Sequence, residues 1–387
     1  MTATIPLGEL VSIRGGGTPS RTKKEFWGGP IPWATVKDFK TTSLDSTLES
    51  ITEDGVRSSA TNIIPAGSIV VPTRMAVGKA AINTVDVAIN QDLKALMPTG
   101  EVDTRFLLHF LLSKSNFLEG QAQGATVKGI KLDLLKSLPF PDLSLNEQRR
   151  IAAILDKADA IRRKREQALN LADEFLKSVF LEMFGDPGTN PKGWPLGTIR
   201  DLVTEAKYGT SQKADPKNGH FPVLRMGNIT YSGRLDLTDL KYIDLAEKDV
   251  PKHTVRKGDL LFNRTNSPDL VGKTTVFDVD EPFAFAGYLV RARTNDLADP
   301  YFISYFLNSG FGKQTLRSMC KSIIGMANIN AQEFQDIPIP VPDRETQAQF
   351  RSIVDAFGAK RALIQDAMLE SIDLFGSLSQ RAFRGEL

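Results

Sequence analysis

Two short patterns in the chain carry residue types that bind phosphate or metal in other proteins. Val271-Gly272-Lys273-Thr274 is similar to the end of a phosphate-binding loop, in which backbone N–H groups and a lysine cradle the phosphates. That loop also requires a glycine at position 267, where this chain has Ser267. The pattern therefore favours a turn between two strands over a nucleotide site.

Asp92-Leu93-Lys94, with Asp86 upstream, faintly resembles the carboxylate pattern of metal-dependent nucleases. Three scattered histidines and the single Cys320 do not have the spacing of a zinc site. No nucleophile–base pair stands out either. We therefore expect no catalytic residue and no metal site in this chain. A two-domain nuclease that uses Asp86 and Asp92 stays an alternative.

The charge balance limits how the chain can bind nucleic acid. Its 387 residues include 48 Lys and Arg against 46 Asp and Glu, a net charge of only +2. Binding by bulk charge is excluded, so basic side chains would have to gather in local patches. No signal-peptide pattern and no apolar stretch of about 18 residues occurs, which predicts a cytoplasmic protein that does not enter a membrane.

The elements that must position any such patch occur twice. Pro6-Leu7-Gly8 returns as Pro195-Leu196-Gly197, and Val77-Gly78-Lys79 returns as Val271-Gly272-Lys273. Pro-x-Pro runs at 139–141 and 338–340 are each followed by a helical stretch in which Gln148 and Gln347 are in step. A period of roughly 190 residues is far longer than that of a solenoid. Each copy is thus a module with short strands, turns, a helix (Thr104 to Leu112, Tyr301 to Leu307) and a long helix.

The long helices are predicted from about Asn146 to Met183 and from about Thr346 to Phe383, where apolar residues recur every three or four positions. The candidate N-caps are Ser144 or Asn146 in the first helix and Asp343 in the second. At 1.5 Å per residue each helix forms a rod of roughly 57 Å. We expect the two rods to pack on each other in antiparallel fashion. The alternative is that each rod packs only on its own globular part.

The same features resemble the specificity subunits of type I restriction–modification systems, the HsdS family. The most specific segments are Phe180-Leu181-Glu182-Met183-Phe184-Gly185-Asp186-Pro187 and the C-terminal run from Leu378 to Leu387. Gly16-Gly17-Thr18-Pro19-Ser20 and the Pro-x-Pro runs also fit, and the resemblance covers essentially the whole chain.

The resemblance implies an α+β fold. Two globular α/β target-recognition domains, 1–142 and 186–342, would be separated by two conserved helices, 143–185 and 343–387. The helices would pack as an antiparallel coiled coil, with pseudo-two-fold internal symmetry.

The resemblance also implies a non-catalytic subunit that reads a bipartite, asymmetric sequence in double-stranded DNA. Two methyltransferase subunits would dock on it, and restriction subunits would join them. S-adenosylmethionine would be held by the methyltransferase, so we expect no cofactor in this chain. A symmetric scaffold that holds two identical partners and never contacts DNA is a further alternative.

Candidate DNA-binding residues are basic or amide side chains in loops near strand ends, because Arg, Asn and Gln are the favoured base-reading side chains. Arg74 and Arg264 are the strongest, since they directly follow apolar strands at places that we take as equivalent. The loop at 15–17 could offer free backbone N–H groups to phosphate, or be a plain turn. Arg162-Arg163-Lys164-Arg165 could be a solvated helix face or contact DNA phosphates. The full set is Arg14, Arg21, Lys23, Lys24, Arg74, Lys79 and Lys128 in the first copy, and Arg225, Asn228, Asn263, Arg264, Asn266, Lys273, Arg317 and Lys321 in the second.

Overall fold

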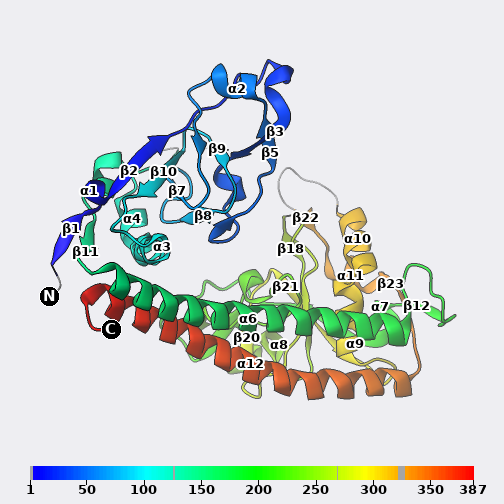
Figure 1. The fold of residues 1–387 in the computed structure, drawn as a ribbon. Coiled ribbons are helices and arrows are strands. Elements are labelled where there is room, and N and C mark those ends of the chain that lie inside the picture. The colour runs from blue at the N-terminus through cyan, green and yellow to red at the C-terminus, as the bar shows by residue number, and fades with distance from the viewer. Residues whose placement is uncertain (1–2, 125–126, 268, 321–326) are drawn as a thin grey trace. The chain divides into compact units, whose positions relative to one another are not determined.

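The computed structural model describes residues 3–124, 127–267, 269–320 and 327–387. It divides into two compact units, one of Met1–Glu166 with Asp366–Leu387 and the other of Gln167–Gln365. Each unit mixes helices and sheets, so the α+β prediction is confirmed (Figure 1). The division into four parts at 142, 185 and 342 stays a prediction.

The first unit holds two main sheets of short strands (Figure 1). The first sheet has the order β2-β10-β7-β8-β4, which are Val11–Gly15, Leu93–Pro98, Ile69–Pro72, Ala81–Asn83 and Ser43–Leu44. The second sheet has the order β5-β3-β9-β6, which are Glu49–Ile51, Trp27–Ala34, Val87–Ile89 and Ile63–Ile64.

The second unit repeats both sheets, except that β4 has no counterpart in it. Its first sheet has the order β13-β21-β17-β19, which are Val203–Tyr208, Leu289–Thr294, Leu260–Asn263 and Thr274–Val276. Its second sheet has the order β15-β14-β20-β16, which are Lys241–Ile243, Phe221–Leu224, Phe283–Phe285 and Thr254–Val255. The parallel pair β3–β9 of the first unit recurs as the parallel pair β14–β20. The predicted duplication is therefore confirmed at the level of strand order and direction.

In each unit a short strand near the start of the globular part pairs with the Pro-x-Pro strand at its end. Strand β1 (Thr4–Pro6) is antiparallel to β11 (Pro139–Pro141), and β12 (Leu196–Thr198) is antiparallel to β23 (Pro338–Pro340). The two Pro-x-Pro runs are thus equivalent, and each closes its globular part directly before the long helix begins. The Pro-Leu-Gly motifs are not equivalent, contrary to the sequence-based expectation: Pro6 matches Thr198, because both pair with the first proline of a Pro-x-Pro run, whereas Pro195 lies three residues earlier.

The two long helices are α6 (Leu145–Phe184) and α12 (Arg344–Arg384). The backbone N–H of Glu147 donates to Ser144 Oγ at 3.3 Å, and that of Thr346 donates to Asp343 Oδ1 at 2.8 Å. These contacts confirm Ser144 and Asp343 as N-caps. Gly185, with a φ of +81°, follows the end of α6, where a left-handed residue commonly terminates a helix.

Within the first unit the start of α6 packs against the end of α12. Arg150 Nη2 donates to the Leu387 carbonyl at 2.8 Å, and Arg165 Nη1 donates to the Ala367 carbonyl and to Ser371 Oγ. A later residue of α6 therefore contacts an earlier residue of α12, as expected of an antiparallel pair.

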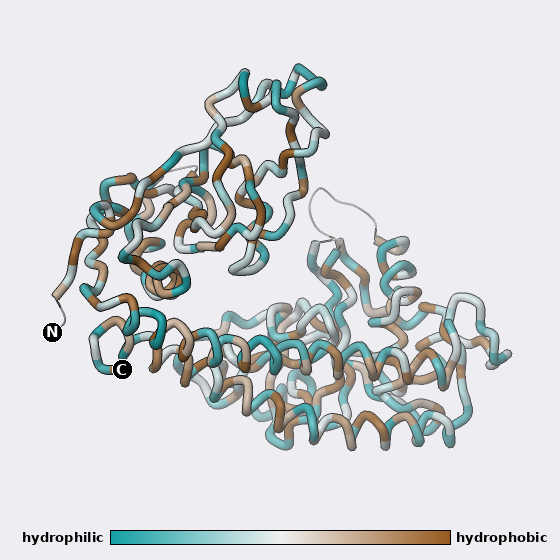
Figure 2. The backbone as a smooth tube through the Cα atoms, viewed as in Figure 1, coloured by the Kyte–Doolittle hydropathy of each residue, from teal (hydrophilic) through white to brown (hydrophobic). Residues whose placement is uncertain are grey.

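Within the second unit the end of α6 packs against the start of α12. Asp173 pairs with Arg361 at 3.0 Å, and the rings of Phe175 and Phe357 stack with centroids 4.8 Å apart. The expected antiparallel packing of the two helices is confirmed in each unit by itself. Figure 2 shows the underlying pattern, apolar residues recurring at intervals along both helices among hydrophilic ones.

The helix pair also packs on the globular part of each unit, where the helix of the other copy takes part, so the alternative of helices that pack only on their own globular part is wrong. In the first unit, Phe383 of α12 contacts Phe106 and Phe110 of α3 (Thr104–Ser113), with ring centroids 5.3 and 5.6 Å apart. In the second unit, α9 (Pro300–Asn308) makes the matching contact, with Phe302 4.9 Å from Phe184.

A buried glutamine joins helix and globular part in both units. Gln148 Oε1 accepts the backbone N–H of Asp103 at 2.9 Å, and Nε2 donates to the carbonyls of Glu101 and Leu143 at 3.0 and 2.9 Å. Gln347 makes the same three bonds at the matching positions of the second unit. The two glutamines, which occupy matching positions in the sequence repeat, thus make equivalent hydrogen bonds in the two units.

Among the described residues, every helix is too short or too polar to span a lipid bilayer.

Candidate nucleic-acid interface

Three strand ends meet at one edge of the β13-β21-β17 sheet in the second unit. Strand β13 ends at Tyr208, β17 ends just before Arg264, and β21 begins just after Tyr288. The Arg264 guanidinium carbon lies 4.8 Å from the centroid of the Tyr208 ring, and its Nη1 donates to the Gly287 carbonyl at 3.4 Å. Tyr208 and Tyr288 are 41% and 49% exposed. An arginine that lies over one exposed aromatic ring suits stacking on a base and hydrogen bonding to a nucleic acid.

Tyr208 is itself fixed in place. Its hydroxyl oxygen accepts the backbone N–H of Ala331 at 2.8 Å, at the start of α11 (Ala331–Gln335). The ring that supports Arg264 is therefore anchored at its far end, which limits the orientations that the guanidinium can take.

The matching sheet edge of the first unit carries different side chains. Arg74, after β7, has a side chain that is 62% exposed and lies 3.7 Å from Asp92 Oδ1. Lys94 Nζ donates to the carbonyls of Gln91 and Leu93 at 3.2 and 3.3 Å. Burial lowers the pKa of Lys94, and Arg74 lowers it further, although Asp92 raises it. The two edges thus share a backbone frame and differ in chemistry.

Arg74 and Arg264 are not equivalent, contrary to the sequence-based expectation. The backbone N–H of Thr73 donates to the Asp92 carbonyl, and that of Arg264 donates to the Tyr288 carbonyl, at 2.8 and 3.0 Å. Arg264 therefore matches Thr73, and Arg74 matches the next residue, Thr265. Since adjacent residues in an extended strand point to opposite faces, the two arginines project from opposite faces of their strands.

The paired lysines are confirmed as structural equivalents, and their ammonium groups bind backbone carbonyls. Lys79 Nζ donates to the Phe39 carbonyl at 3.1 Å. Lys273 is buried, and its Nζ donates to the carbonyls of Met226, at 2.9 Å, and Ile229. Burial lowers the pKa of Lys273. Both lysines hold a short 3-10 turn in place, which explains why Val-Gly-Lys recurs.

Asn228 has a similar internal role. This buried residue accepts the backbone N–H of Arg225 at 2.9 Å through Oδ1, and its Nδ2 donates to the carbonyls of Asp236 and Asp239. Asp38 caps the matching turn of the first unit by accepting the N–H of Thr35 at 2.7 Å.

Three candidate arginines have acidic partners inside their own unit. Arg21 pairs with Glu49 and lies over the Trp27 ring, with Cζ 3.7 Å from its centroid. Arg225 pairs with Asp239 at 2.8 Å and Arg317 with Asp269 at 3.2 Å. A nucleic acid would have to compete with these carboxylates.

The other candidates fall into three groups. Within the described residues, the exposed side chains of Arg14, Lys24 and Lys128 make no recorded hydrogen bond or ion pair, while Lys23 lies 5.0 Å from the Phe26 ring. Asn263 is fully buried, and Asn266 Oδ1 accepts the N–H of Ser267 at 2.9 Å. Lys321 lies outside the described residues.

The glycine loop at 15–17 closes on strand β9. The Gly17 N–H donates to the Ile89 carbonyl at 3.0 Å, and a Cβ on Gly16 would lie only 2.0 Å from that oxygen. The expectation that the N–H of Gly17 is free for phosphate is therefore wrong. Gly209 of the second unit approaches the Phe285 carbonyl in the same way, with a Cβ distance of 2.2 Å. The sequence did not show this equivalence, because the second unit has one glycine where the first unit has three in a row.

The two patterns that suggested other chemistry also have structural roles. Gly272, with a φ of +76°, lies in a turn before β19, so the prediction of a turn is confirmed. Asp86 precedes β9 and accepts the Ala66 N–H at 2.8 Å, whereas Asp92 follows β9. The described residues contain no cluster of three or more His, Cys, Asp or Glu that could hold a metal ion.

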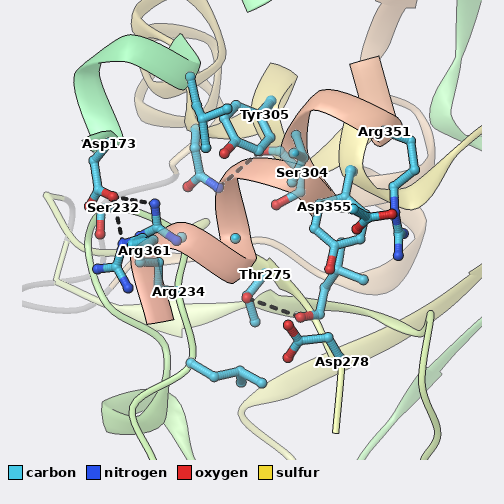
Figure 3. Close-up of a pocket in the computed structure, with 18 of the residues that line it drawn as sticks. Asp173, Ser232, Arg234, Thr275, Asp278, Ser304, Tyr305, Arg351, Asp355 and Arg361 are labelled. Atoms are coloured by element: carbon cyan, nitrogen blue, oxygen red, sulfur yellow. Dashed lines mark hydrogen bonds and ion pairs between the residues drawn. The ribbon is translucent and has the colours of Figure 1, made fainter. Parts of the chain in front are cut away.

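A pocket of about 440 Å³ lies within the second unit, between its globular part and its helix segments (Figure 3). Asp173 accepts from both Arg234 and Arg361, and Arg351 pairs with Asp355 at 2.7 Å. Burial raises the pKa of Tyr305 to about 12. These ion pairs join the helix segments to each other and to the globular part within the pocket.

Comparison with known proteins gives consistent results. The family model described as "Type I restriction modification DNA specificity domain" matches residues 2–171 and 191–373. The chain is 38% identical over 162 residues, 40% of each chain, to the specificity subunit of the type I restriction enzyme EcoR124I/EcoR124II of Escherichia coli. It is 24% identical to the MjaIX specificity subunit of Methanocaldococcus jannaschii, covering 96% of this chain and 92% of that protein.

Solved structures show the same fold. The S subunit of a type I restriction–modification system from M. genitalium superposes with a TM-score of 0.59 at 14% identity, covering 99% of this chain and 96% of that one.

Proposed function

Since the chain belongs to the type I restriction modification DNA specificity domain family, we propose that it is a specificity subunit that selects the DNA sequence on which a restriction–modification complex acts. Each unit would read one half of a bipartite site. The two half-sites would be unlike, so the complex would have a defined orientation on DNA.

One observation carries this proposal: two copies of one fold present different side chains at the same sheet edge. In the second unit the Arg264 guanidinium lies over the exposed Tyr208 ring and its backbone bonds that of exposed Tyr288, where the first unit has Asp92 and Arg74. A repeated scaffold with divergent edges suits the recognition of two different versions of one kind of ligand. Duplex DNA is such a ligand, because each base pair presents its own pattern of donors and acceptors in the major groove.

The chemistry would lie on partner subunits. We propose that methyltransferase subunits bind S-adenosylmethionine and methylate adenine, that restriction subunits can join the complex, and that this chain contributes no catalytic group. The paired helix segments of α6 and α12 are the candidate docking surface, because they form a long solvated element outside the two reading edges.

The test is to express the chain with the methyltransferase encoded beside it and to map methylated adenines across a genome. We expect a single sequence with two unlike halves and a fixed spacer. The purified chain alone should not cut DNA in the presence of magnesium. Methylation without a defined sequence would favour the scaffold alternative, and cutting by the lone chain would favour the nuclease.

A further inference from the structure

The first unit has a groove of about 620 Å³ beside Arg74 that the sequence did not reveal. Both polar and apolar side chains line it. Its lining includes Arg74, Gln121, Gln123, Val127, Ile130 and Lys131.

Three backbone segments meet at this groove. Gly129 forms an antiparallel bridge with Arg74 on one side and with Gln123 on the other. The N–H groups of Gln123 and Gly129 donate to each other's carbonyls, both at 2.9 Å. A Cβ on Gly129 would lie 2.9 Å from the Thr73 carbonyl, so only glycine permits this approach. The segments that carry Arg74 and Gln123 thus lie on either side of Gly129, which pairs with both.

Most polar side chains of the groove make few contacts within the protein. Gln121 and Gln123 are exposed, and within the described residues neither side-chain amide has a recorded hydrogen bond. Arg74 has only the long 3.7 Å contact with Asp92. Val127 is 48% exposed, and the neighbouring Met75 is 61% exposed and has a φ of +64°, a left-handed conformation that is rare for such a residue. Exposed apolar groups and backbone strain often mark sites that bind a partner.

These residue types match the donor and acceptor pattern of base edges. A glutamine amide can donate to and accept from N7 and N6 of one adenine, an arginine can donate twice to guanine, and an apolar side chain can contact the thymine methyl group. We propose that this groove is a base-reading site of the first unit, with Gln121 and Gln123 reading adenine and Arg74 reading guanine. The proposal rests on the proposed function and names residues that would give it sequence selectivity.

The sequence of the second unit has a single glutamine, Gln314, between Gly310 and Asn328, so it offers no second pair of glutamines before the matching bridge. Thr265 and Asn328 occupy the place of the Arg74–Gly129 bridge, and Thr265 Oγ1 donates to Asn328 Oδ1 at 3.0 Å. Changes to the groove should therefore affect one half of the DNA site and leave the other half intact.

The experiment compares methylation maps of complexes, each formed with the methyltransferase subunit, that carry the wild-type chain or the double variant Gln121→Ala with Gln123→Ala. We expect one or more A·T positions in a single half-site to become degenerate, with discrimination at those positions lowered roughly tenfold or more. The matched control is Gln314→Ala, which truncates an exposed glutamine on α10 (Gly310–Met319) of the second unit. It should leave that half-site unchanged.

Two results would overturn the proposal. One is a double variant that methylates the original site with full selectivity. The other is a variant that loses selectivity in both halves equally while it keeps the wild-type melting temperature and still copurifies with the methyltransferase. If the wild-type complex itself shows no defined sequence, the proposed function fails, and that failure is visible before any variant is made.

Discussion

At the scale of single residues, Arg264 is a basic side chain at an exposed sheet edge whose orientation is restricted by two contacts. The Tyr208 ring lies beneath its guanidinium and the Gly287 carbonyl accepts one of its N–H groups. Little rotamer freedom remains to be lost when it binds, which favours a specific contact over a general electrostatic one. Arg74 keeps an exposed side chain and would be ordered by the DNA itself.

We predict that Arg264→Ala leaves assembly with the methyltransferase intact and lowers the methylation rate at the native site by roughly tenfold or more, as loss of one bidentate base contact does. Arg264→Lys should be nearly as poor, because an ammonium cannot reproduce the planar stacking on Tyr208. The measurement is the methylation rate on a duplex containing the mapped site. A normal rate for Arg264→Ala would show that this residue does not read DNA.

Residue types alone predicted candidate readers, but not which side chains are already engaged. Lys273 follows a turn, as a phosphate-binding lysine would, yet its ammonium binds the carbonyls of Met226 and Ile229, more than 40 positions away in sequence. Gln121 and Gln123 carry no charge and do not follow a predicted strand, so residue type and local pattern give no signal for them. Only the fold brings them beside Arg74. A sequence shows which polar groups are present, but whether each one already has a hydrogen-bond partner depends on residues far away in the chain.

At the scale of elements, the buried glutamine at the start of each long helix is a polar link between helix and globular part that recurs in both units. The side chain of Gln347 bonds the Asp299 N–H and the carbonyls of Leu297 and Pro342. Removing it would leave these three backbone groups without a partner in a buried place, and each orphaned group is costly.

We predict that Gln347→Ala lowers the free energy of unfolding by about 2–4 kcal/mol, from the cost of burying unpaired polar groups. Denaturant titration of the complex-free chain, or of the complex if the chain is insoluble alone, gives the value. Gln380→Ala, which truncates an exposed glutamine on the same helix, should change stability by less than about 0.5 kcal/mol. Equal effects of the two variants would contradict a specific role for Gln347.

The long helices were predicted well because their signals are local: a three-four apolar repeat, Ser144 and Asp343 as caps, and Gly185 as a stop. The motif repeats identified the duplication for the same reason. Strand order was not predictable, since the parallel pairs β3–β9 and β14–β20 join segments more than 50 residues apart. The one-residue offset between Arg74 and Arg264 was also hidden, because register depends on the bonds of Thr73 and Arg264 to a neighbouring strand end.

At the scale of the whole molecule, both long helices run through the boundary between the two units, which lies at 166/167 in α6 and at 365/366 in α12. At both boundaries the chain passes from one unit to the other as continuous helix. The number of helical residues at the boundary is therefore a natural candidate for the quantity that sets the spacer between the two half-sites.

We predict that deletion of residues 163–169 together with 365–371 shortens the spacer and leaves both half-sites unchanged. The two segments face each other, since Arg165 bonds Ala367 and Ser371, so the deletion removes these partners together and orphans none of them. Seven residues correspond to about 10 Å of helix, or at most about three base pairs of DNA. One heptad turns the following helix by only about 20°, so each remaining segment still presents its apolar face to its partner. Methylation mapping gives the spacer directly, and deletion of 163–169 alone is the control, because it breaks the register and should abolish activity. If the double deletion methylates the original spacer, the helices do not determine its length.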